Sequence, residues 1–322
     1  PLGFAAARVL GKAKSVLDRR LQRAPVWQVG RRAARERSAP GTPLDAAAFH
    51  RLADDGGRYY ADPFVIEHAG ATHLFVEELP YATGRGIVSH TLIDASGKME
   101  RPVPVLETAH HLSYPHVFAH AGEIWMLPEC AASGRLDLYR ADPFPHHWVR
   151  HATLIDAPVH DATLVAHAGR WWITAGVALG AASSWDTLAI YSADRIDGPW
   201  RPHPGNPVLV DARAARPAGA IFHRDGALWR PAQDCRGGYG AALSLCRIDR
   251  LDPERFSQTL VSTLHFGAPG DHTGPHTLNH GGGFEVVDFF APRAPAGHAR
   301  GSTSRSGAVD EKELRAHPPV LL

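Results

Sequence analysis

One hairpin pattern recurs five times along this chain of 322 residues. Each copy contains an apolar strand-like run, a turn with glycine and a second run rich in aromatic and β-branched residues, which is typical of a β-hairpin. The copies occupy residues 61–77, 114–129, 161–174, 218–231 and, in a weaker form, 276–288. Self-similarity with a period of roughly 50 residues indicates a repeat architecture, so this feature constrains the fold more than composition does.

Further strand-like runs separate the hairpins and bring each repeat to about four strands, the content of one propeller blade. These runs are residues 87–93, 103–106, 136–140, 148–154, 188–193, 208–210, 241–248 and 258–261. No long helical pattern interrupts residues 50–290, which excludes a βαβ architecture. We therefore predict an all-β fold, a five-bladed β-propeller with a short N-terminal helix and a disordered C-terminal tail.

The ends of the chain differ from its centre. Residues 1–45 are expected to form a helix, over residues 4–23, and a linker, within which Val26–Gly30 is a candidate strand to close the ring. The propeller is assigned to residues 46–292. Residues 293–322 form the tail, because its Pro, Gly, Ser and Arg content cannot bury enough apolar surface to order it.

Composition excludes several classes of function. Lys and Arg number 34 against 33 Asp and Glu, so no strong field attracts nucleic acid. No apolar run approaches the roughly 18 residues of a membrane span. Cys130, Cys235 and Cys246 show no pairing pattern, which predicts reduced thiols and a cytoplasmic location. Phosphate-loop, dinucleotide and zinc motifs are absent, so we expect neither a cofactor nor a metal.

Polar residues mark the starts of the predicted inner strands, which in a propeller converge at one mouth of the central channel. In chain order these residues are Asp62, Tyr114 with His116, Asp161, Arg216 and His276. Five segments that are distant in sequence are thus expected to place polar groups at the same mouth of the channel. We predict a ligand site there, for which Tyr114, His116, Arg216 and His276 supply binding groups.

The repeats resemble a known domain. The segments ADPFVIEHAG, SYPHVFAHAGEIWMLPE, HDATLVAHAGRWWI, RPAGAIFHRDGALWRPAQDC and HTLNH followed by VVD are similar to the N-terminal domain of plant glucosamine inositolphosphorylceramide transferases. More distantly they resemble the five-bladed glycosidases, namely arabinanases, β-xylosidases, invertases and levansucrases. The resemblance spans residues 58–290 and implies a sugar-handling ancestry. It leaves the reaction open, because a fold does not fix a function.

Glycosyl transfer needs a carboxylate and a proton donor on either side of the anomeric carbon. The resemblance implies that Asp62 is a general base and that Asp161 orients the site and tunes its pKa values; a turn or cap is the structural alternative for both. Arg216 stands where the glycosidases carry their acid. Arginine cannot donate a proton at ordinary pH, but it can grip an anion. The expected ligand is therefore a sugar or glycoconjugate that is anionic or carries phosphate.

Other residues have open roles. Glu129 and Asp234 are candidate replacement acids, with a salt bridge or a place on the rim as the alternative. Arg230 and Gln233 are expected to bind sugar hydroxyls or to join blades. Tyr239 is a candidate stacking face or blade packing. His276 occupies a position where related glycosidases present a histidine to the pocket.

Three functions remain open at this point. The first is a carbohydrate-active propeller that acts on glycosidic bonds, as a glycosidase or a glycosyl-transferring relative, in polysaccharide or glycolipid metabolism. The second is a non-catalytic sugar-binding module that assists a glycosyltransferase partner. The third, a protein-interaction propeller, predicts an apolar channel mouth. A second carboxyl group facing Asp62 at the spacing of a glycosidase, about 5 to 9.5 Å, would favour the first.

Overall fold

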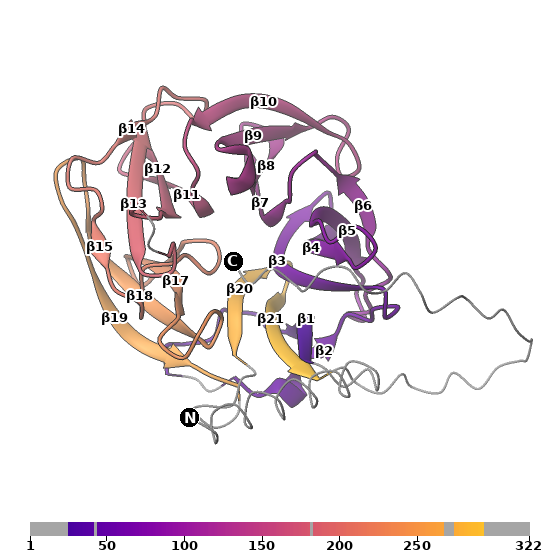
Figure 1. The fold of residues 1–322 in the computed structure, drawn as a ribbon. Helices are drawn as coiled ribbons and strands as arrows, with labels where there is room; N and C mark the ends of the chain where they lie inside the picture. The colour runs from indigo at the N-terminus through magenta and orange to yellow at the C-terminus, as the bar shows by residue number, and fades with distance from the viewer. Residues whose placement is uncertain (1–24, 42–43, 181–182, 267–273, 293–322) are drawn as a thin grey trace, which may run out of the picture. The chain divides into compact units, whose positions relative to one another are not determined.

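Five antiparallel sheets follow one another around a central axis (Figure 1). The computed structural model describes residues 25–41, 44–180, 183–266 and 274–292, and residues 26–291 form one compact unit. The predicted five-bladed propeller is confirmed. The helix expected over residues 4–23 and the tail expected from residue 293 lie outside the described residues.

Each blade is a sheet of four or five strands. Blade 1 contains β3 (Arg58–His68), β4 (Ala71–Pro80), β5 (Ile87–Ile93) and β6 (Val103–Leu106), and blade 2 contains β7 (Ser113–His120), β8 (Glu123–Glu129), β9 (Leu136–Ala141) and β10 (Trp148–Ile155). Blade 3 contains β11 (His160–His167), β12 (Arg170–Gly176), β13 (Thr187–Ala193), β14 (Arg201–Pro202) and β15 (Leu209–Val210). Blade 4 contains β16 (Phe222–Arg224), β17 (Ala227–Asp234), β18 (Ala242–Leu251) and β19 (Phe256–Leu264), and blade 5 contains β20 (Pro275–Gly281), β21 (Phe284–Pro292), β1 (Pro25–Ala33) and β2 (His50–Arg51).

Helical structure is confined, in the described part of the chain, to the 3-10 turns η1 (Ala46–Ala48) and η2 (Ala131–Ser133). No helix that the structure describes has the length and apolarity to cross a bilayer. The repeated hairpin turns have a simple local cause. In Ala69-Gly70 both residues have positive φ, 51° and 77°, and the Ala-Gly or Asp-Gly pairs of blades 2, 3 and 4 repeat this geometry. It is the primed turn that matches the twist of two antiparallel strands.

Apolar side chains fill the spaces between neighbouring blades. Trp125, Trp172 and Trp229 lie on the second strands of blades 2, 3 and 4 and are buried in three separate core clusters. Burying a large apolar side chain contributes roughly 3 kcal/mol to folding stability, so these tryptophans contribute strongly to the packing between blades.

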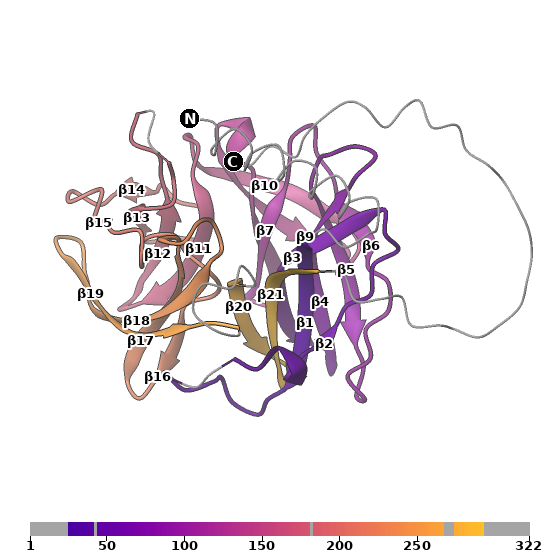
Figure 2. The same ribbon diagram turned by 60° about the horizontal axis from the view of Figure 1, so that its bottom comes forward.

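A strand from the N-terminal part of the chain closes the ring. β1 lies between β2 and β21 in blade 5, as Figure 2 also shows. The N–H of Ala34 donates to the carbonyl of Gly283 at 2.9 Å, and Arg32 forms an ion pair with the buried Glu285 at 2.6 Å. The propeller therefore begins at β1, before the boundary expected at residue 46.

Removal of residues 25–51 should prevent the ring from closing. Val286 and Val287 in β21 are fully buried, and without β1 they would lie at an exposed strand edge. An exposed apolar edge promotes aggregation. We expect the truncated chain to lose cooperative thermal unfolding in circular dichroism, whereas a chain that starts at residue 25 is the control. Cooperative unfolding of both chains would contradict this role of β1.

Candidate functional site

The inner strands bulge where the sequence places the site. Strand register shifts in blades 1, 2, 3 and 5 at residues 61–64, 113–116, 160–163 and 275–278. At these bulges Asp62, Tyr114 and Asp161 have φ values of 49°, 44° and 50°, in the left-handed region that side chains other than glycine rarely adopt. Bulges re-aim side chains, and strained backbone concentrates at functional sites. The repeated backbone strain therefore marks this end of the channel as the candidate functional site.

Carboxylates satisfy the strained N–H groups and join each blade to the next. The N–H of Asp62 donates to Asp288 Oδ2 at 2.7 Å, and that of Tyr114 donates to Asp62 Oδ2 at 3.1 Å. In the next blade the N–H of Asp161 donates to Glu129 Oε2 at 2.8 Å. Asp62, Glu129 and Asp288 consequently have an architectural role, whatever their role toward a ligand.

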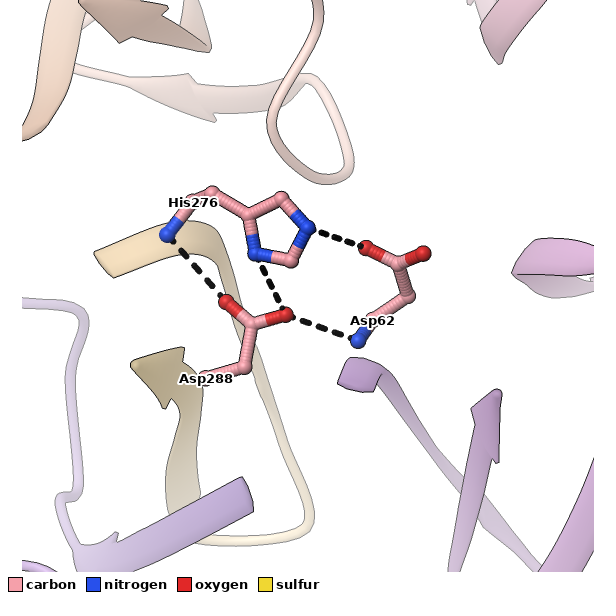
Figure 3. A group of neighbouring side chains, drawn as sticks. All are labelled: Asp62, His276 and Asp288. Atoms are coloured by element: carbon pink, nitrogen blue, oxygen red, sulfur yellow. Dashed lines mark hydrogen bonds and ion pairs between the residues drawn. The ribbon is translucent and has the colours of Figure 1, made fainter. Parts of the chain in front are cut away.

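Asp62, His276 and Asp288 form the first charged cluster (Figure 3). His276 Nδ1 lies 2.7 Å from Asp288 Oδ2, and its Nε2 lies 3.3 Å from Asp62 Oδ1, so the imidazole bridges two carboxylates. Burial opposes the positive charge of His276, but the charges of Asp288 and Asp62 outweigh it and raise the pKa of His276 to about 9. Burial also raises the pKa of Asp62, against the attraction of His276.

These three residues are the one group in the described part of the chain whose ligand atoms come close enough to hold a metal ion. Both nitrogens of His276 already face carboxylates, and the raised pKa of His276 means that a proton supplies the positive charge there. A metal would have to displace that proton, since metal ligands bind deprotonated. The same three residues can therefore form an imidazolium bridge between two carboxylates or, with His276 deprotonated, supply the ligands of a metal ion.

Arg216 organises a second cluster with Asp161 and Glu129. Its Nε lies 2.6 Å from Asp161 Oδ2, its Nη1 donates to Ser184 Oγ at 2.7 Å, and its Nη2 lies 3.8 Å from Glu129 Oε2. Burial raises the pKa of Asp161 to about 7, although Arg216 opposes the rise. Burial acts the same way on Glu129, but the hydrogen bond from His160 and the charge of Arg216 outweigh it and lower that pKa to about 2.

The two clusters belong to one electrostatic site, because the charges of Asp161 and Glu77 both help to raise the pKa of Asp62. The carboxyl groups of the site are those of Asp62, Glu77, Glu129, Asp161 and Asp288, and its strongest cations are Arg216 and His276. A further histidine, His111, lies 3.1 Å from Glu77. Carboxyl groups outnumber the two strongest cations, but burial raises the pKa values of Asp62 and Asp161 and so reduces the negative charge of the site.

Half-buried aromatic rings surround the charged groups. Trp27 stacks on His276 with ring centroids 3.9 Å apart, and Tyr239 lies 5.3 Å from His276 and 5.6 Å from Trp185. The guanidinium of Arg216 lies over Tyr239 at 5.2 Å. Tyr239 was a candidate stacking residue in the sequence, whereas Trp27 and Trp185 lie outside the repeated hairpins and carried no sequence signal for the site.

Tyr114 and His116, which the sequence proposes as binding groups, make contacts between blades. The fully buried Tyr114 hydroxyl contacts Thr163 Oγ1 at 2.8 Å and accepts the N–H of Gly219 at 2.6 Å. His116 Nδ1 accepts the N–H of Leu164 at 3.2 Å, and burial lowers the pKa of His116 to about 4. Both side chains thus join neighbouring blades, which supports a structural role for each.

Of the remaining predicted residues, one belongs to a charged cluster and the other two make contacts within the protein. Gln233 Nε2 donates to Asp161 Oδ2 at 3.2 Å and so belongs to the second cluster. Arg230 is fully buried and donates to Gln258 and to the carbonyls of Ala214 and Ala215, which favours the structural alternative for this residue. Asp234 pairs with Arg236 at 2.7 Å on the turn that follows β17.

Sequence comparison places the chain in a family. Residues 31–270 match the family model described as glucosamine inositolphosphorylceramide transferase 1, N-terminal. The chain belongs to this family. His276 and Asp288 lie beyond the range that the family model of these transferases matches.

Full-length relatives are considerably longer than this chain. The rice (Oryza sativa subsp. japonica) glucosamine inositolphosphorylceramide transferase 1 is 33% identical over 267 residues, which cover 77% of this chain and 34% of the relative. The Arabidopsis thaliana protein of the same name is 33% identical over 208 residues, which cover 63% of this chain and 27% of the relative. The chain thus spans about a third of the curated relatives it matches.

Solved glycosidases share the fold. The β-xylosidase RS223 superposes with a TM-score of 0.53 at 10% identity, covering 73% of this chain and 92% of the other. Zg3597, a family 117 glycoside hydrolase from Zobellia galactanivorans, superposes with a TM-score of 0.51 at 11% identity, covering 84% of this chain and 91% of the other. At these identities the likeness establishes the propeller fold alone.

Proposed function

We propose that this propeller binds a sugar unit of a glycoconjugate and does so without cleaving it, as a recognition module in glycolipid or polysaccharide synthesis. The transfer reaction named for the plant relatives would then reside elsewhere in the longer proteins, or in a separate glycosyltransferase. The three cysteines are buried and free, so a reducing, cytoplasmic location is part of this proposal.

The Asp161–Arg216 ion pair is the observation that carries the proposal. Arg216 stands at the position where the glycosidase resemblance expects an acid. It places a permanent cation 2.6 Å from the carboxylate of Asp161 in the third blade. Glu129, a candidate replacement acid, has a pKa lowered to about 2, so it holds no proton near neutrality. A glycosidase mechanism with two carboxyl groups needs one that holds a proton near neutral pH.

Charge favours a neutral or amine-bearing sugar over an anionic one. The sequence suggests that Arg216 grips an anion, but its Nε and Nη1 are engaged by Asp161 and Ser184, and the residue is buried. The carboxyl groups that already engage Arg216 and His276 compete with a phosphate or uronate, and they can accept hydrogen bonds from an ammonium group. The name of the plant relatives contains such an amino sugar, glucosamine. Tyr239 and Trp185 offer ring faces on which a sugar can stack.

A second candidate, glycosyl transfer or hydrolysis at this site, has one observation in its favour. Burial raises the pKa of Asp161 to about 7 and also raises that of Asp62, so a proton donor and a base could coexist there near neutral pH. Turnover of aryl glycosides or of a nucleotide sugar by the isolated chain would establish this candidate and contradict the binding-only proposal.

Tyr239→Ala should weaken sugar binding about tenfold, because a stacking aromatic face contributes on the order of 1 kcal/mol beyond its apolar area. Calorimetric titration with methyl glycosides of glucosamine, glucose and glucuronic acid measures both affinity and charge preference. Tyr191→Ala, a half-buried tyrosine in β13 away from the site, is the matched control. Tighter binding of the glucuronide than of the other two, or equal affinity in the variant and wild type, would refute the proposal.

A further inference from the structure

A cavity between blades 1 and 5 contains an arginine without a partner. The cavity has a volume of about 500 Å³ and is lined by β1, by the β3–β4 and β20–β21 turns and by the β5–β6 loop. Arg31 in β1 lines it and is only 8% exposed. Its Nε has no hydrogen-bond partner, and no ion pair of Arg31 occurs among the residues that the structure describes.

A guanidinium whose Nε is buried without a hydrogen-bond partner is unusual. Arginine does not lose its proton at ordinary pH, so it cannot avoid the cost of burial by becoming neutral. The other buried arginines of the propeller, Arg216 and Arg230, are each satisfied by carboxylate, hydroxyl, amide or carbonyl oxygens. Arg31 has only a contact with the ring of Phe284, at 5.6 Å, which is a weak compensation.

The nearest acidic group does not fill this role. Asp94 also lines the cavity, but its Oδ1 accepts the N–H groups of Ser96 and Lys98 within its own turn. Burial lowers the pKa of Arg31, and the charge of Asp94 offsets that effect only in part. The local structure thus leaves the positive charge of Arg31 available to an anionic ligand.

Glycines leave space around the guanidinium. Gly97 has φ of 81°, and a Cβ there would collide with the Arg31 guanidinium. Gly282, with φ of 57°, lies against Thr72 on the opposite wall, where a Cβ would collide with the threonine hydroxyl. Small residues at both walls keep the cavity open beside the charge.

We propose that this cavity binds a phosphate ester through Arg31. The planar guanidinium fork matches the oxygens of a phosphate, and the volume falls within the range of about 300–1,000 Å³ typical of small-molecule sites. The cavity lies at the ends of β3 and β20 opposite Asp62 and His276, so this second site is separate from the proposed sugar site. A sugar phosphate and a phospholipid headgroup share this chemistry.

Titration of the full chain with glucose 1-phosphate and inorganic phosphate tests the proposal. We expect binding to wild type and at least about tenfold weaker binding to Arg31→Gln, since hydrogen bonds to charged groups contribute at least that factor. Arg31→Lys should be intermediate, because it keeps the charge and loses the fork. Lys98→Gln removes a nearby charge that does not line the cavity and should bind as wild type does. Saturating methyl glucosaminide should leave phosphate binding to wild type unchanged, which separates this site from the sugar site.

Two further measurements complete the test. Without ligand, Arg31→Gln should unfold at the same or a higher temperature than wild type, because it removes a charge that has no ion-pair partner and whose Nε is buried without a hydrogen bond. Co-flotation with phosphatidylinositol vesicles, against phosphatidylcholine vesicles as control, identifies a lipid source of the phosphate, and binding of glucose 1-phosphate alone identifies a soluble one. Binding of no probe, equal affinity in Arg31→Gln, or a marked loss of its thermal stability would overturn the proposal.

Discussion

Arg216→Met is expected to lower the free energy of unfolding by about 3–5 kcal/mol at pH 7, the usual effect of leaving buried charges without their partner. Methionine keeps an unbranched apolar stem but lacks the guanidinium, so Asp161 and Glu129 would face each other without the cation between them. The pKa values of both carboxyls would rise in the variant. Protonation then relieves the repulsion, so the difference from wild type should shrink as the pH falls from 7 to 5.

Urea unfolding at both pH values measures this difference. Arg230→Met is the matched control, because Arg230 is equally buried but donates to an amide and to backbone carbonyls, which do not titrate. Its loss of stability should be the same at pH 5 and pH 7. A deficit of Arg216→Met that is independent of pH would mean that the arginine contributes by packing alone.

His276→Gln should lose about 3 kcal/mol of stability at pH 6, and the loss should disappear above pH 9. The folded pKa of His276 is about 9, above the ordinary value of 6.5, and this difference corresponds to the stated energy. A raised histidine pKa stabilises the fold fully below about pH 6.5, and the contribution declines as the pH rises through 9. Wild-type stability should therefore fall across this window more steeply than that of the variant.

His116→Gln is the control for this experiment, because burial shifts the pKa of His116 in the opposite direction, to about 4. Its titration affects stability between pH 4 and 6.5, so its difference from wild type should be constant between pH 6.5 and 9. Unfolding curves at half-unit pH intervals distinguish the two variants. A constant gap for His276→Gln between pH 6 and 9.5 would show that the imidazolium bridge does not exist in solution.

The sequence was sufficient to predict the ring of blades and the end of the channel at which these polar residues lie. Hairpins with Ala-Gly or Asp-Gly turns encode their own geometry, and repetition places equivalent residues at equivalent positions around the axis. For this reason Asp62, Asp161, Arg216 and His276 could be grouped before any coordinates were known. The strand from residues 26–30 could also be suspected of closing the fifth blade, although not its full extent over Pro25–Ala33.

What the sequence could not supply was the pairing of side chains across blades. No periodicity reveals that Arg216 meets Asp161, or that Asp288 accepts the N–H of Asp62, because these partners lie 55 and 226 residues apart. The bulges were equally invisible, and they change the direction in which the neighbouring side chains point. Tyr114 and His116, at the predicted position, make contacts between blades, whereas Trp27 from the closing strand stacks on His276.

The closing strand also contributes directly to the candidate sugar site. Trp27 near the start of β1 and Phe290 near the end of β21 have ring centroids 5.4 Å apart, and Trp27 stacks on His276. Ring closure and the aromatic wall of the site therefore depend on the same strand. Loss of β1 would remove the Trp27 ring from His276 together with the strand partner of β21, so the site cannot be complete in a ring that is open.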